Sequence, residues 1–164
     1  MPVQLDQVDS KILELIQEDA GLSVAEIAEK VGLSSSPCWR RIKRMEEQGV
    51  IEKRVTLLNR QKLGMDFEVI ASVKLGLPNR ENLQNFETLV QNWPEVTDCM
   101  TVTGAVDYVV HIVTTDMHAY DDFLRDKILG TELVSDVQSR IVIRSTKRSS
   151  SLPLNLLKTS SSPD

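Results

Sequence analysis

A basic run in an acidic chain is the stretch with the clearest capacity for chemistry. Arg40, Arg41, Lys43 and Arg44 fall within five positions directly after the segment SSSPCW (34–39), although the chain has a net charge of −5. Guanidinium and ammonium groups can pair with phosphates or guanine edges, and serine hydroxyls can approach a base closely. Binding depends on the field at the contact surface and not on the total charge. The run therefore indicates a local nucleic-acid face.

The loop TGAVDY (103–108) is a second candidate site. Gly104 permits a positive φ and close approach of a ligand to the backbone, whose N–H groups could hold an α-carboxylate. Asp107 could accept a hydrogen bond from an α-ammonium group. Those are the needs of an amino-acid zwitterion. Gly and Asp are also ordinary turn residues between antiparallel strands, and the residue types alone favour that simpler interpretation.

The cysteines and histidines predict no metal site and no cofactor. Cys38, Cys99, His111 and His118 are widely spaced, unlike the clusters that zinc requires. Cys38 could be a redox sensor, but its place in an apolar stripe favours a packed small side chain. The chain has no Gly-rich phosphate loop, no carboxylate pair at helical spacing and no nucleophile beside a base. We therefore expect no enzyme activity.

Three helices are predicted in the first third of the chain. Apolar residues at helical spacing run from Asp6, a good N-cap, to Gln17. A second helix starts after Ser23, which has capping-box spacing to its partner three residues later, and stops at Gly32. Ser34, Ser35 or Ser36 can cap a third helix, which runs to about Gln48. This layout is typical of a helix-turn-helix.

The third helix places its basic residues on the outside. Cys38, Ile42 and Met45 recur at helical spacing and must face the other helices, so Trp39, Arg40, Lys43 and the serines turn outward. The following GVIEKRVTLL (49–58) suggests a hairpin or wing. A solvated amphipathic helix is the alternative, and Trp39 could either stack on DNA or cover the helix flank. The predicted DNA-binding residues are Ser34, Ser35, Ser36, Trp39, Arg40, Lys43, Arg44 and Lys53.

The second half of the chain changes to strand-like alternation. Its segments read β-α-β-β-α-β: strands at 67–77, 95–104, 107–115 and 134–145, with helices at 79–93 and 117–129. This order predicts a ferredoxin-like fold, an antiparallel four-stranded sheet with both helices on one side. An apolar uncovered face would need a partner, most simply the same sheet of a second subunit, so we expect a homodimer.

Composition and the positions of turn-forming residues predict the organisation of the chain. We expect a DNA-binding domain over 1–57, a linker over 58–66, a ligand-binding and oligomerisation domain over 67–148, and a Ser/Pro-rich tail over 149–164 that frays at its end. No window approaches the roughly 20 consecutive apolar residues of a membrane span, and the start lacks the features of a signal peptide. We therefore expect a cytoplasmic protein without a membrane partner.

Nearly the whole chain resembles the Lrp/AsnC family of transcription factors, the leucine-responsive and asparagine regulators. LDQVDSKILELIQEDAGLSVAEIAEKVGLSSSPCWRRIKRMEEQGVI resembles the winged helix-turn-helix of the family, and WPEVTDCMTVTGAVDYVVHIVTTDMHAYDDFL resembles its ligand-binding half. The resemblance implies an α+β architecture, a dimer built through the C-terminal sheets, and further assembly into a tetramer or octamer. It also implies an amino-acid site lined by Thr103, Gly104, Ala105, Asp107, Tyr108, Gln138 and Ser139.

The resemblance makes a ligand-responsive regulator of transcription the first hypothesis. Its partners would be double-stranded DNA and a small amino acid. Ala105 and Val106 stand where many family members carry a larger residue, which favours an effector with a small to medium side chain, aliphatic or sulfur-containing. The alternative is a DNA-organising protein of the same architecture that needs no effector. The two differ in whether a small molecule changes DNA binding or assembly.

Overall fold

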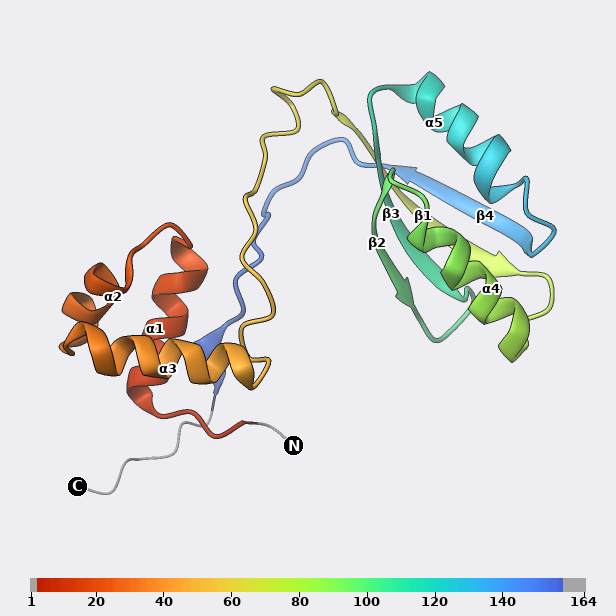
Figure 1. The fold of residues 1–164 in the computed structure, drawn as a ribbon. Helices are drawn as coiled ribbons and strands as arrows, with labels where there is room; N and C mark the ends of the chain where they lie inside the picture. Colours follow the sequence, from red (N-terminus) through yellow and green to blue (C-terminus); the bar gives the residue numbers. More distant parts are fainter. Residues whose placement is uncertain (1–2, 158–164) are drawn as a thin grey trace. The chain divides into compact units, whose positions relative to one another are not determined.

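The computed structural model describes residues 3–157, which fold as two units. One unit holds the residues up to Leu57 together with those from Lys147 onward, and the other spans Leu58–Thr146 (Figure 1). Among the described residues, no helix combines the length and apolar character needed to cross a membrane. We describe each unit by itself.

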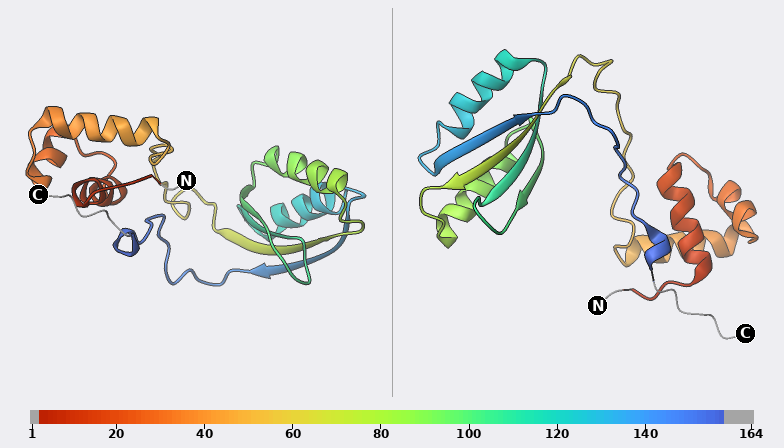
Figure 2. Two further views of the ribbon diagram at one scale, coloured as in Figure 1. Left: turned by 90° about the horizontal axis from the view of Figure 1, so that it is seen from below. Right: turned by 180° about the vertical axis from the view of Figure 1, so that it is seen from behind.

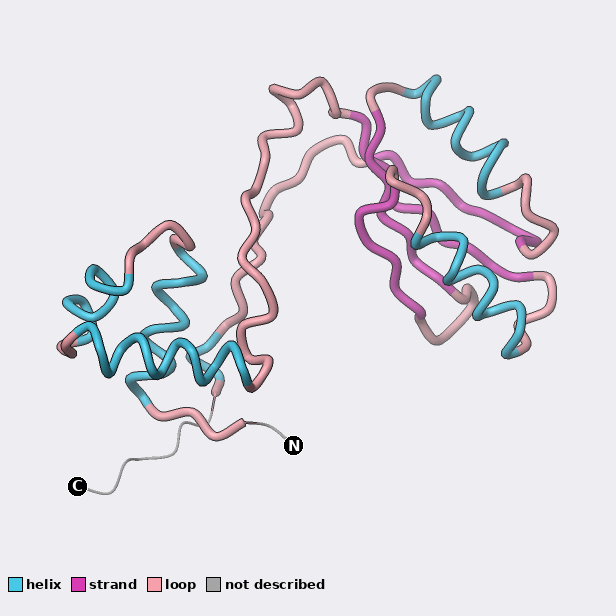
Figure 3. Tube along the Cα trace, viewed as in Figure 1, coloured by secondary structure: helices cyan, strands magenta, loops and turns pink. Residues whose placement is uncertain are grey.

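Three helices form the first unit: α1 (Gln7–Glu18), α2 (Val24–Val31) and α3 (Ser35–Glu47) (Figure 3). Asp6 caps α1 and Ser23 caps α2, each through a reciprocal capping box. Gly32 ends α2 in the left-handed conformation at φ 72°, which costs a glycine little. The three predicted helices are confirmed, because their start and stop signals are local.

The core of this unit lies on the helix faces that the periodicity predicted, with Leu13 added to them. It consists of Ile12, Leu13, Ile16, Ile27, Ala28, Cys38, Ile42 and Met45. Cys38 and Met45 are completely buried. Burying such side chains contributes on the order of 1.5–3 kcal/mol each, which fixes the rotation of α3 about its axis. The outward direction of the opposite face of α3 follows from this packing.

The segment after α3 does not form the expected hairpin. Residues 52–59 contain no strand, and all of them are exposed. The sequence between Gly49 and Asn59 contains no turn residue that would fold two strands together, and a solvated two-stranded ribbon is marginal by itself. The expected hairpin is therefore replaced by an exposed loop, in which Lys53 lies.

The C-terminal tail returns to the helical unit. The amide side chain of Gln17 accepts a hydrogen bond from the Leu152 N–H at 2.7 Å and donates to the Leu152 carbonyl at 3.4 Å. Leu154, in a short 3₁₀ turn (Leu154–Leu156), packs against the helical core. The end of the tail, which we expected to fray, lies at 158–164 and outside the described residues.

The second unit is a four-stranded antiparallel sheet with two helices. Its elements are β1 (Phe67–Leu75), α4 (Arg80–Gln91), β2 (Val96–Thr101), β3 (Tyr108–Thr114), α5 (Met117–Phe123), which continues as a π-helical turn (Leu124–Ile128), and β4 (Val134–Ile141). The strand order is β2-β3-β1-β4. The predicted α+β class and ferredoxin-like order are confirmed.

Both helices cover the same face of this sheet (Figure 2). On β1 the odd-numbered residues Val69, Ala71 and Val73 are fully buried beneath them. An aromatic cluster completes the core, formed by Phe86, Trp93, Tyr108, Tyr120 and Phe123. Because successive side chains on a strand point to opposite faces, the even-numbered residues of β1 lie on the open face.

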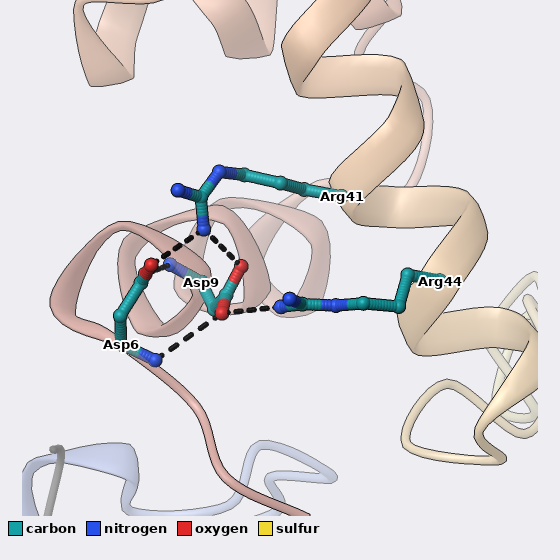
Figure 4. Close-up of polar contacts among 4 residues, drawn as sticks. All are labelled: Asp6, Asp9, Arg41 and Arg44. Carbon is teal, nitrogen blue, oxygen red and sulfur yellow. Dashed lines mark hydrogen bonds and ion pairs between the residues drawn. The ribbon is translucent and has the colours of Figure 1, made fainter.

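An ionic network ties α3 to the start of α1 (Figure 4). Arg41 Nη1 lies 2.6 Å from an oxygen of Asp6 and 2.8 Å from an oxygen of Asp9. Arg44 Nη2 lies 2.6 Å from the other oxygen of Asp9. The side chain of Asp9 is 1% exposed, so its charge depends on these two arginines for compensation. The network therefore sets the position of α3 relative to α1.

We expect Asp9→Ala to lower the free energy of unfolding of the helical unit by about 2–3 kcal/mol, the scale of lost hydrogen bonds to charged groups. The substitution removes both ion pairs and the Asp9 half of the capping box. Denaturant unfolding followed by circular dichroism measures the loss. Glu14→Ala is the matched control, since Glu14 is an exposed carboxylate on the same helix. Equal stability of the two variants would contradict the structural role of the network.

Candidate nucleic-acid interface and ligand loop

The outward face of α3 carries most of the predicted DNA-binding residues. Ser34, Ser35 and Ser36 lie exposed at the start of the helix, and Arg40 and Lys43 are exposed along it. Ser34 is the N-cap, but its side chain makes no capping hydrogen bond, so its hydroxyl is available to a ligand. Trp39 is 54% exposed on the flank of the same helix. Helix N–H groups, hydroxyls and cations therefore lie on one surface.

The four basic residues of α3 divide into two pairs. Arg40 and Lys43 face solvent, whereas Arg41 and Arg44 turn toward the carboxylates of α1. Arg44 remains 45% exposed while one of its nitrogens is held. Pro37 and the three arginines line an open recess of about 270 Å³. Ion pairs with Asp6 and Asp9 hold the guanidinium groups of Arg41 and Arg44 in defined positions next to the outward face.

The pKa values within this network follow from its contacts. Burial by itself would raise the pKa of Asp6, but the hydrogen bond from the Asp9 N–H and the pairing with Arg41 lower it overall. The same contacts with Asp6 and Asp9 raise the pKa of Arg41. Both groups are therefore charged at neutral pH. Arg41 is not among the predicted DNA-binding residues, and acceptors 32 and 35 positions away in the sequence hold its guanidinium group.

The ligand loop lies between β2 and β3 and is anchored by Asp107. The Asp107 N–H donates to the Val73 carbonyl at 2.9 Å, and its carboxylate Oδ2 accepts from the Leu75 N–H at 2.7 Å. Gly104 has φ 126°, a backbone conformation that residues with a side chain rarely adopt. Thr103, Gly104 and Ala105 are exposed. One carboxylate oxygen of Asp107 thus serves the fold, and the rest of the loop is open to solvent.

The remaining predicted ligand residues do not share one surface. Tyr108 is fully buried under α4, where its hydroxyl donates to Glu87 Oε1 at 3.1 Å. Burial first, and then the contact with Glu87, raise the pKa of Tyr108 to about 12. Ser139 bonds the Tyr120 hydroxyl at 2.5 Å on the helix-covered side, whereas Gln138 stands opposite Ser72 on the open face. The loop, Gln138 and Ser139 are exposed, Ser139 at the helix-covered face, and Tyr108 alone is buried in the core.

The cysteines are packed side chains. Cys38 is fully buried in the helical core, and burial raises the pKa of its thiol. Burial also raises the pKa of Cys99 to about 11, so this thiol is protonated at neutral pH. Within residues 3–157 no group of three or more His, Cys, Asp and Glu side chains is arranged to hold a metal ion.

Sequence reasoning missed a charged cluster on the open face of the sheet. Glu68 in β1 contacts both Arg60, from the turn that precedes β1, and His111 in β3. Asp98 is the register partner of His111 on β2. The available signal was a carboxylate at the start of β1, at an even position, but its partners Arg60 and His111 lie 8 and 43 positions away in the sequence.

Comparison with known proteins agrees with this architecture. Residues 68–152 match the family model described as the Lrp/AsnC ligand binding domain. Residues 5–52 match a model described as winged helix-turn-helix DNA-binding. The two matches divide the chain at the same region as its two units.

Full-length relatives show the same arrangement. The transcriptional regulator AzlB of Bacillus subtilis is 36% identical over 155 residues, which cover 94% of this chain and 99% of AzlB. The crystal structure of an AsnC family regulator from Agrobacterium tumefaciens is 41% identical, with a TM-score of 0.88 over 92% of this chain and 98% of that one.

A further solved structure contains a bound amino acid. It is the Neisseria meningitidis regulator NMB0573 in complex with L-Met, which is 36% identical, with a TM-score of 0.89 over 93% of this chain and 98% of that one. With a helix-turn-helix unit, a ferredoxin-like ligand-binding unit and matches along both, the chain belongs to the Lrp/AsnC family of DNA-binding transcriptional regulators.

Proposed function

We propose that the protein binds specific double-stranded DNA sequences through the outward face of α3 and that an apolar α-amino acid, bound at the loop after β2, adjusts this binding. The observation that carries the proposal is the division of the basic residues of α3. Arg41 and Arg44 are held by carboxylates of α1, and Arg40 and Lys43 face solvent beside the serines. A helix that is positioned rigidly and presents free donors is suited to reading the major groove.

DNA contact by this surface requires two kinds of interaction. Arg40 and the serines at the helix start can reach base edges, because they occupy the exposed N-terminal half of α3. Arg44 and Lys53 lie at its margin, where they can pair with backbone phosphates and set orientation. Trp39 can pack against the sugar-phosphate backbone. The protein would act where the DNA is, in the cytoplasm, and no catalytic step, metal or cofactor is needed.

The effector proposal rests on the ligand loop and on the chemistry of a related complex. Thr103 to Ala105 offer exposed backbone to a carboxylate, and Asp107 has a second carboxylate oxygen beyond the one bound to Leu75. Ala105 and Val106 leave room for a side chain of small to medium size. The Neisseria relative forms a complex with L-Met. Methionine or an aliphatic amino acid of similar size is therefore the class that we propose.

Assembly is proposed to occur through the open face of the sheet. Ile70 is 38% and Met100 46% exposed on this face, and Val109 and Val113 lie beside them half-buried. A second copy is the simplest cover, because an identical sheet is complementary by two-fold symmetry. We propose a homodimer formed in this way, which assembles further into a tetramer or octamer. The proposed domain limits are 1–57 for DNA binding and 67–148 for ligand binding and assembly, with 58–66 as the linker.

Arg40→Ala is expected to weaken binding to a selected operator by about 1–3 kcal/mol, the usual cost of losing a good base contact. Fluorescence anisotropy at fixed salt measures the change, and unchanged unfolding shows that the fold is intact. Arg80→Ala is the control, since Arg80 is exposed on α4 of the other unit. Operator affinity of Arg40→Ala equal to that of the control would remove Arg40 from the reading surface.

The double variant Ile70→Asn with Met100→Asn is expected to raise the dimer dissociation constant at least about tenfold, because each apolar side chain that stays in water forfeits on the order of 1.5–3 kcal/mol. Sedimentation equilibrium of the full chain measures it. Met117→Asn is the control, since Met117 is 64% exposed but starts α5 on the helix-covered side. A dimer weakened only by the Met117 change would place the contact on the helices.

Asp107→Asn should separate the two roles of this side chain. Asparagine keeps an oxygen that can accept the Leu75 N–H but loses the negative charge that an α-ammonium group would contact. We expect amino-acid affinity to fall about tenfold or more in calorimetric titrations, while effector-free DNA binding is unchanged. Affinity equal to wild type would show that Asp107 only anchors the turn. If no amino acid alters DNA binding by the wild type, an effector-independent DNA-organising protein becomes the better description.

A further inference from the structure

A partly buried ionic cluster joins the start of the sheet to the turn that precedes it. Residues 59–65 form a compact turn in which the Met65 N–H donates to the Arg60 carbonyl at 2.8 Å and the Lys62 N–H donates to the Asn59 side chain at 3.1 Å. The Arg60 guanidinium group contacts one carboxylate oxygen of Glu68 in β1. The other oxygen of Glu68 contacts Nε2 of His111 in β3. We call Arg60, Glu68, His111 and Thr97 the linker latch.

The latch also includes Thr97 of β2, a strand at the edge of the sheet. Thr97 Oγ1 lies 2.8 Å from Nδ1 of His111 and 3.3 Å from the His111 carbonyl, so both ring nitrogens of this histidine have partners. The contacts therefore run from the turn through β1 and β3 to the bulge of β2. The charged groups next to His111 are Glu68, Arg60 and Asp98.

Stability is a poor explanation for this arrangement. The Glu68 side chain is 6% exposed and that of Arg60 22%, and Nη1 of Arg60 is buried without a hydrogen-bond partner. Removing such charges from water costs several kcal/mol each, so a buried pair often contributes less than an apolar pair would. What a charged pair with defined geometry does provide is a single position for the groups it joins. The arrangement thus favours a positioning role for Arg60.

The position of the turn 59–65, which Arg60 defines, matters for the proposed function. The turn 59–65 belongs to the chain that leads out of the DNA-binding unit into β1. β3 begins at Tyr108, directly after the candidate effector loop, and carries His111 on its open face. β1 carries Glu68 near its start, and its Leu75 N–H binds Asp107 of the loop. A structural change at the loop can therefore reach the latch residues through β1 and β3, which are adjacent strands with a fixed register.

We infer that Arg60 is a positioning residue, which through Glu68 and His111 couples occupation of the effector loop to DNA binding. The inference rests on the proposed function, because it requires an effector at that loop. Release of the latch leaves the helix-turn-helix surface and the effector loop intact but frees the turn between them. A ligand can alter DNA affinity only through a difference in free energy between two arrangements, and a free turn lowers that difference.

The coupling factor is the measured quantity, defined as the ratio of operator dissociation constants with and without a saturating amino acid. Each of the twenty amino acids is tested on the wild type, and the one with the largest factor is kept. We expect Arg60→Met to bring the factor to within about twofold of one, while effector-free DNA affinity and calorimetric amino-acid affinity stay within about twofold of wild type. Lys62→Met is the matched control, a cation in the same turn that is exposed.

Rescue and a double-mutant cycle test the mechanism. Arg60→Lys keeps a cation within reach of Glu68 and should restore part of the coupling, which a loss of packing alone would not predict. Glu68→Gln should lower coupling, and adding it to Arg60→Met should have little further effect if both act through one contact. Hydrogen exchange of the Leu63 and Met65 amides, which bond within the turn, should quicken in Arg60→Met but not in Lys62→Met.

The outcomes distinguish a failure of the proposed effector response from a failure of the proposed role of Arg60. A wild type whose DNA affinity no amino acid alters would overturn the proposed effector response. A wild type that responds, together with an Arg60→Met variant that responds equally, would overturn the role of the latch alone, even if amide exchange in the turn becomes faster. Loss of effector-free DNA binding in Arg60→Met would also overturn it, because Arg60 would then be required for DNA binding itself.

Discussion

A sheet covered by helices on one face only is the constraint on which the second unit depends. The alternation of side chains commits Val69, Ala71 and Val73 to the core and sends Glu68, Ile70 and Ser72 to the other side. The open face then combines apolar side chains that favour a second copy with charged ones that need partners within the chain. Arg140 donates to Ser72 at 2.8 Å, and Arg60 and His111 share Glu68. The proposed dimer contact and the contacts of the turn 59–65 thus share one surface.

The first unit faces a different constraint, which is that a helix rich in cations must also pack. Three core residues determine which side of α3 is buried, but they leave four cations close together, whose mutual repulsion would oppose folding. Asp6 and Asp9 at the start of α1 accept two of them. The same carboxylates complete the capping box of α1. Arg41 and Arg44 therefore hold the helix, and Arg40 and Lys43 stay exposed.

The ligand loop shows how one residue can serve both fold and function. Asp107 binds the backbone of β1 at Val73 and Leu75, so the loop is attached to the centre of the sheet and not only to its own hairpin. A proposed effector contact at Asp107 would therefore be made to a residue that is hydrogen-bonded to β1. The exposed part, from Thr103 to Ala105, can differ among regulators without disturbing the sheet.

Local order was predictable from the sequence because it depends on neighbours within a few residues. The caps at Asp6 and Ser23, the stop at Gly32 and the inward stripe of Cys38, Ile42 and Met45 are all encoded at helical spacing, and the structure contains them. The alternation of the second half likewise indicated the order of strands and helices. The residue types of α3 indicated a DNA-binding face, and the family resemblance extended this to a ligand-responsive regulator.

Only the tertiary structure decided which charges are free and which residues share a face. The partners of Arg41 and Glu68 come from other elements, and no short-range pattern specifies them. Gln138 and Ser139 are neighbours in sequence, yet the strand sends them to opposite faces, and the loop after α3 lacks a second strand to pair with. These outcomes depend on strand register and on helix packing, which are set by the summed free energy of many distant contacts.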